Sequence, residues 1–79
     1  MIYLLTEQVM NGTITKDIIT TGIEAESFDA AFEKLTHFEN WGQAVNVAKD
    51  DKQVSYTIPG SSGGFGVWGL MKNEPLRVR

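Results

Sequence analysis

The fold of this chain is decided by one stretch of sequence, Ser27-Phe28-Asp29-Ala30-Ala31-Phe32-Glu33-Lys34-Leu35-Thr36-His37-Phe38. Within it, apolar residues recur at the spacing of a single helical face. Ser27 can accept a hydrogen bond from a free backbone N–H as the N-cap, and Asp29 suits the positive end of a helix. We therefore predict a helix of about three turns over residues 28–38. Its buried stripe consists of Phe28, Ala31, Phe32, Leu35 and Phe38.

The residues before this stretch are typical of a β-hairpin, which we place at residues 2–21. Asn11-Gly12 favours a two-residue turn, because both residues tolerate positive φ. Both faces of this hairpin are apolar near its open end, and the face that carries Tyr3 and Leu5 has more apolar residues. That face is favoured to receive the helix. Counting outward from the turn predicts these cross-strand pairs: Met10–Thr13, Val9–Ile14, Glu7–Lys16, Leu5–Ile18 and Tyr3–Thr20.

The residues after the helix, 43–79, are typical of a second hairpin and C-terminal strands. Residues 43–48 and 53–58 flank a turn at Lys49–Lys52, and further strands are expected at residues 67–71 and 76–79. A lone amphipathic helix must cover the face of a sheet. We therefore predict one α+β domain over residues 1–79, with a four- to five-stranded antiparallel sheet, one helix packed on one face, and the order ββαβββ.

The composition excludes several kinds of chemistry. Cysteine is absent and His37 is the only histidine, which excludes disulfides, thiolate zinc sites and Cys-His catalysis. The glycine loop Gly60–Gly66 lacks the lysine and the following helix of a phosphate-binding loop, so Phe65 is either a binding residue or part of a bulged strand entry. We expect no catalytic residue, no metal and no cofactor. The longest apolar run is too short to span a bilayer, and no export signal is present, which predicts a soluble cytoplasmic protein.

Charge is unevenly distributed along the chain. Six acids and one lysine lie between Asp17 and Glu39, whereas basic residues prevail after Val47. Such a distribution is typical of solvated charges that keep a small protein soluble, which is the more common case. It is also typical of an acidic surface that binds a basic partner with the help of apolar anchors. The expected partner-binding residues are Glu24, Glu26, Asp29, Glu33, Glu39, Trp41 and Phe65.

The first half of the chain resembles small phage-encoded anti-CRISPR proteins of the type I-F kind. The resemblance lies in Tyr3-Leu4-Leu5-Thr6-Glu7, followed by a hairpin, and in Ile23-Glu24-Ala25-Glu26-Ser27, which opens the helix with Ala30 and Ala31 following. It implies a single helix on an antiparallel sheet, no enzymatic activity, and binding to a surface of the host interference complex. In such relatives the helix and its following loop supply basic contacts, whereas this chain offers only Lys34 there. Their contact scheme therefore does not carry over.

Three functions remain open at this point. The first is an inhibitor that binds a host defence protein or ribonucleoprotein complex, in the host cytoplasm if the chain is phage-encoded. The second is a nucleic-acid-binding module that uses an aromatic residue on a bare sheet face with the basic residues Lys52, Lys72, Arg77 and Arg79. The net charge of -3 argues against this second function. The third is a self-associating structural protein, for example a homodimer.

Overall fold

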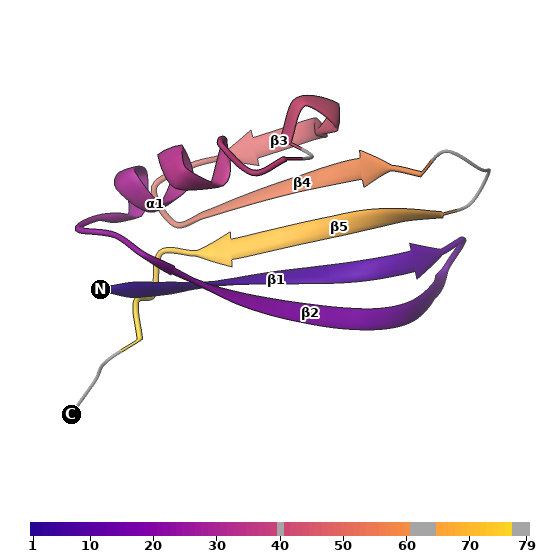
Figure 1. The fold of residues 1–79 in the computed structure, drawn as a ribbon, viewed down its shortest axis with the longest axis horizontal. Coiled ribbons are helices and arrows are strands. Elements are labelled where there is room, and N and C mark those ends of the chain that lie inside the picture. Colours follow the sequence, from indigo (N-terminus) through magenta and orange to yellow (C-terminus); the bar gives the residue numbers. More distant parts are fainter. Residues whose placement is uncertain (40, 61–64, 77–79) are drawn as a thin grey trace.

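In the computed structural model, residues 1–39, 41–60 and 65–76 are described, and they contain one α-helix, one short 3-10 helix and five strands. The strands form one antiparallel sheet in the order β2-β1-β5-β4-β3 (Figure 1). This confirms the predicted α+β class and the order ββαβββ. The elements are β1 (Ile2–Asn11), β2 (Ile14–Glu24), α1 (Phe28–Leu35), η1 (Trp41–Gln43), β3 (Val45–Lys49), β4 (Gln53–Pro59) and β5 (Phe65–Lys72).

Helix α1 begins where the sequence predicts. Ser27 is the N-cap, and its hydroxyl accepts a hydrogen bond from the backbone N–H of Ala30 at 3.1 Å. Phe28, Ala31 and Leu35 are buried against the sheet, as the spacing of the apolar residues requires. This capped, one-sided helix therefore supplies one layer of the core.

The predicted C-terminal boundary of the helix, residue 38, is wrong, because α1 ends at Leu35. The backbone N–H of Thr36 is shared between the carbonyls of Phe32 and Glu33, and its hydroxyl donates to the Glu33 carbonyl at 2.6 Å. The following amides bond to carbonyls three residues back, which tightens the chain into a 3-10 turn. As a result Phe38 leaves the apolar stripe and is 38% exposed.

The predicted register of the first hairpin is also wrong. The turn consists of Gly12-Thr13 instead of Asn11-Gly12, and Gly12 takes the positive φ of 61° that the first position of a type II′ turn requires. The pairing then shifts between Val9 and Met10, which leaves Lys16 as an extra residue in β2. Beyond this bulge Tyr3 pairs with Ile23 instead of Thr20.

The core lies between α1 and one face of the sheet, at the end where the chain begins (Figure 1). Tyr3 and Leu5 of β1 are on this face, as favoured from the sequence, and the shifted register brings Ile23 beside Tyr3. On β4, the buried residues Val54 and Tyr56 alternate with more exposed residues. The buried residues are Tyr3, Leu5, Ile23, Ala25, Phe28, Ala31, Leu35, Val54, Tyr56 and Met71.

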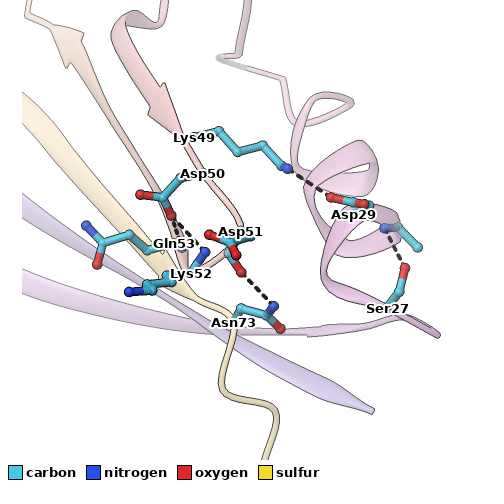
Figure 2. Close-up of polar contacts among 9 residues, drawn as sticks. Ser27, Asp29, Lys49, Asp50, Asp51, Lys52, Gln53 and Asn73 are labelled. Atoms are coloured by element: carbon cyan, nitrogen blue, oxygen red, sulfur yellow. Dashed lines mark hydrogen bonds and ion pairs between the residues drawn. The ribbon is translucent and has the colours of Figure 1, made fainter.

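The second hairpin is present with changed bounds. Its first strand begins at Val45 instead of residue 43, because residues 41–43 form η1. The turn before β4 is fixed by Asp50, whose carboxylate accepts hydrogen bonds from the backbone N–H groups of Lys52 at 2.7 Å and Gln53 at 2.9 Å (Figure 2). Those two hydrogen bonds lower the pKa of the Asp50 carboxyl.

The predicted last strand, residues 76–79, is described only at its first residue. Leu76 makes an isolated bridge to Ile2, with its N–H donating to the Ile2 carbonyl at 2.7 Å. Residues 77–79 lie outside the described part of the chain, and so do residues 61–64 of the glycine loop.

Candidate functional site

Four of the predicted binding residues lie close together in the chain, around the start of α1. Glu24 ends β2, Glu26 lies between β2 and the N-cap, and Asp29 and Glu33 are one turn apart on α1. All four are exposed. We call these residues, Glu24, Glu26, Asp29 and Glu33, the acidic segment.

Two lysines lie beside the acidic segment and offset part of its negative charge. Lys49 of β3 reaches across to α1, where its Nζ lies 2.8 Å from the Asp29 carboxylate (Figure 2). Lys34 donates a hydrogen bond from its Nζ to the backbone carbonyl of Glu24. Within the described residues the only ion pair is the one between Asp29 and Lys49. Glu26 and Glu33 therefore carry charge that no described cation neutralises.

Lys49 also holds the helix onto the sheet. Its Nζ lies 5.3 Å from the ring centroid of Phe28 and 5.4 Å from that of Phe32. A cation at this distance from an aromatic ring is attracted by the quadrupole of the ring. Lys49 and Asp29 thus link β3 to α1, and their ion pair partly offsets the charge of Asp29, whereas Glu26 and Glu33 have no described cation paired with them.

A pocket of about 370 Å³ opens on the helix-covered face, beside the C-terminal end of α1. Aliphatic side chains of α1, β4 and β5 form part of its wall, and three aromatic residues and two acids form the rest. We call it the tyrosine pocket. Its aromatic and acidic residues are Glu7, Phe38, Glu39, Trp41 and Tyr56.

Tyr56 and Glu7 are joined in this pocket. The Tyr56 hydroxyl donates a hydrogen bond to Oε2 of Glu7 at 3.0 Å, and Tyr56 itself is buried. Burial, together with the hydrogen bond and the negative charge of Glu7, raises the pKa of Tyr56 above its ordinary value. The hydroxyl therefore remains a donor, and Glu7 provides a half-buried carboxylate on the sheet floor.

Trp41 is fixed by the aromatic rings around it. Its ring centroid lies 5.2 Å from that of Tyr56 and 5.8 Å from that of Phe32, and both pairs are edge-to-face. It is half-buried and lines the tyrosine pocket. Trp41 is thus held in place as one wall of the pocket, with part of its side chain exposed.

The structure therefore divides the predicted binding residues into separate places. Glu39 and Trp41 line the tyrosine pocket, which none of the four residues of the acidic segment lines. Phe65 begins β5, and its side chain lies outside the described part. Sequence reasoning missed Glu7 as a site residue, because it paired Glu7 with Lys16, whereas Glu7 lies opposite Ile19. An acid between Leu5 and Val9 on the strand face that receives the helix was the available signal.

The opposite face of the sheet has a hollow of about 430 Å³, which is lined by four apolar residues and four polar or charged ones. Leu4 is 39% exposed there, and Trp68 of β5 is 40% exposed. Trp68 lies across from Gln8 of β1, and Lys72 follows Trp68 on the same face of β5. We call this surface the open face and define it by Leu4, Trp68, Leu70 and Leu76, which line the hollow together.

Over residues 1–39, 41–60 and 65–76, no three His, Asp or Glu side chains gather as a metal ion would need. His37, in the turn after α1, is exposed. The described part of the chain also contains no helix with the length and apolarity to cross a bilayer.

Comparison with known proteins gives no relative. No family model matches the chain, and neither a curated protein nor a solved structure matches it.

Proposed function

We propose that this chain is a small non-enzymatic inhibitor that binds a host CRISPR-Cas protein or complex, as the anti-CRISPR proteins that its first half resembles do. The observation that carries this proposal is the acidic segment, in which Glu26 and Glu33 are exposed and free of any described ion pair. A surface that binds nucleic acid is basic, and an acidic protein surface can occupy it. Binding there would block the interference complex sterically and electrostatically.

The charge of the acidic segment would act mainly on the rate of encounter. Complementary potentials steer two proteins together, whereas desolvated apolar and aromatic side chains supply most of the affinity. Trp41, next to the same helix, is a candidate for the apolar contact, because it is half-buried and held in place by two rings. We therefore expect association that slows as salt is added, with a smaller effect of salt on dissociation.

The test uses a purified type I-F interference complex and the purified chain. We expect a stoichiometric complex on size exclusion and loss of target-DNA binding. The double variant Glu26→Lys/Glu33→Lys should slow association about tenfold at low salt. Asp29 is left unchanged, because its ion pair with Lys49 supports the packing of α1.

The matched control is Asp17→Lys/Glu74→Lys, which changes the net charge equally at two exposed sites outside the acidic segment. It should associate much faster than the Glu26/Glu33 variant. Equal slowing by both variants would mean that only net charge matters, and the acidic segment would lose its role. A chain that never binds the complex would overturn the proposed function itself.

One observation favours a second candidate, a module that binds single-stranded nucleic acid. Trp68 is exposed on the open face with Lys72 on the same strand face, and a base can stack on such a ring while a lysine contacts phosphate. Arg77 and Arg79, also expected to take part, lie outside the described residues. Salt-sensitive retardation of a labelled oligonucleotide that is lost in Trp68→Ala would favour this module. Absence of retardation at low salt would exclude it.

A further inference from the structure

We propose that the tyrosine pocket binds a cationic side chain, above all an arginine guanidinium, presented by the partner protein. Three aromatic rings and two carboxylates converge on this pocket of about 370 Å³. An aromatic face attracts a cation, and a carboxylate accepts charge-assisted hydrogen bonds from it. The pocket offers both kinds of contact at one place.

The pocket carries negative charge that the described residues do not neutralise. None of the described residues that line it is basic, and the one described ion pair lies elsewhere, between Asp29 and Lys49. The described hydrogen bonds of Glu7 use only Oε2, which accepts from Tyr56. A half-buried carboxylate of this kind is stabilised by a cation that brings further donors.

The Tyr56 hydroxyl also orients Glu7. Its hydrogen bond of 3.0 Å fixes the carboxylate on the sheet floor, while Glu39 approaches from the turn after α1. The two acids thus come from different sides of the pocket. Both acids line the pocket that the cation would enter, and the edge-to-face pair of Trp41 and Tyr56 keeps the aromatic wall rigid.

The size and chemistry of the pocket favour arginine. Its volume of about 370 Å³ is at the small end for a ligand pocket, which suits one side chain more than a large cofactor. A guanidinium is planar, stacks on aromatic rings, is weakly hydrated and presents several donors at once. This inference rests on the proposed function only for the source of the arginine, since the pocket itself can be tested without the complex.

The probe is N-acetyl-arginine amide, titrated into the isotope-labelled chain and followed by NMR. The chain has two tryptophans, so its two indole N–H signals report on two places at once. Trp41 lines the tyrosine pocket, whereas Trp68 lies on the open face and is the internal control. We expect the Trp41 signal to shift with a Kd on the order of 1 mM, as for so small a ligand. The Trp68 signal should stay in place.

The neutral isostere N-acetyl-citrulline amide should bind at least about fivefold more weakly, because it keeps the shape and loses the charge. Glu39→Gln should weaken arginine binding by a similar factor. Glu7→Gln should do the same while keeping an acceptor for Tyr56. The control Glu33→Gln removes the same charge outside the pocket and should leave the Kd unchanged. Equal binding of citrulline, or an unchanged Kd in Glu39→Gln, would overturn the proposal.

A titration with methylguanidinium distinguishes a pocket for a free guanidinium ion from a pocket for an arginine side chain of a polypeptide. It should bind more weakly than the amide, and equal or tighter binding would overturn the assignment to a partner's side chain. The outcome is independent of the inhibitor test. If the chain binds arginine but not the interference complex, the arginine pocket stands and the proposed function is wrong. If the chain binds the interference complex but not arginine, the proposed function stands and the arginine pocket is wrong.

Discussion

The two faces of the sheet are made by the same strands, and both are apolar, yet only one is covered. On β1, Leu5 is 0% exposed beneath the helix layer, and its neighbour Leu4 is 39% exposed on the open face. The two leucines differ in exposure because α1 covers one face of the sheet and not the other, and not because of their residue type. Apolar content alone therefore does not identify the core of this chain, and the exposed leucine and tryptophan remain available for contact with another molecule.

The largest effect that we expect separates these two leucines. Leu5→Ala should lower the free energy of unfolding by about 3 kcal/mol, because it empties a fully enclosed position. Leu4→Ala should cost less than about 1 kcal/mol, since its side chain is partly in water already. Urea denaturation of both variants measures the difference. Equal losses would mean that the open face is covered too, for example by a second copy of the chain.

A smaller effect concerns two glycines on opposite faces. Gly69 of β5 lies under the ring of Tyr56, and a methyl group added to it would overlap that ring. Gly69→Ala should therefore cost about 2 kcal/mol, as overpacking does. At Gly22 the added methyl group would meet only the Cγ2 of Ile2, at 3.2 Å. We expect thermal denaturation to show a small change for Gly22→Ala, and a comparable loss there would contradict the contrast between the faces.

Alkaline pH should weaken the covered face selectively. Because the folded chain raises the pKa of Tyr56 above the ordinary 10.0, this tyrosine contributes stability in full below pH 10.0 and loses it as the pH rises further. The slope from one such group is at most about 1.4 kcal/mol per pH unit. Urea denaturation between neutral and strongly alkaline pH should show a steeper loss in the wild type than in Tyr56→Phe. Parallel curves would contradict the burial of this hydroxyl.

The smallest effect belongs to the turn between β3 and β4, outside both faces. Two backbone N–H groups lower the pKa of Asp50 below the ordinary 3.8, so its contribution is present above pH 3.8 and is lost as the pH falls below it. Acid denaturation of the wild type should therefore show a small decline that Asp50→Asn lacks. A difference as large as that of Leu5→Ala would contradict the expectation that this turn contributes less to stability than the core does.

The elements of this fold could be predicted because their signals are local. The apolar spacing and Ser27 specify α1, and alternation specifies β4. The hairpin register could not be predicted, because turns at Asn11-Gly12 and Gly12-Thr13 differ by one residue and the bulge at Lys16 has no sequence signature of its own. Packing decides between them.

The candidate site, like the fold, could be predicted only in part. The acidic segment follows from the sequence, because charged residues are exposed by default. The contact between Glu7 and Tyr56 joins residues 49 positions apart, and it requires the registers of β1, β5 and β4 to be known together. No sequence pattern near either residue indicates that the two are in contact.

The extra residue Lys16 has a consequence for how the first hairpin can vary. Without that bulge the pairing would bring Gly22, and not Ile23, opposite Tyr3, and the isoleucine would face outward. The bulge therefore sets the parity of β2, and the tip of the hairpin lies between it and Gly12. Residues could be added to or removed from this tip in numbers that preserve the parity while the core stays intact. Adding or removing an odd number of residues in β2 would move the side chains at the base of this strand to the opposite face of the sheet.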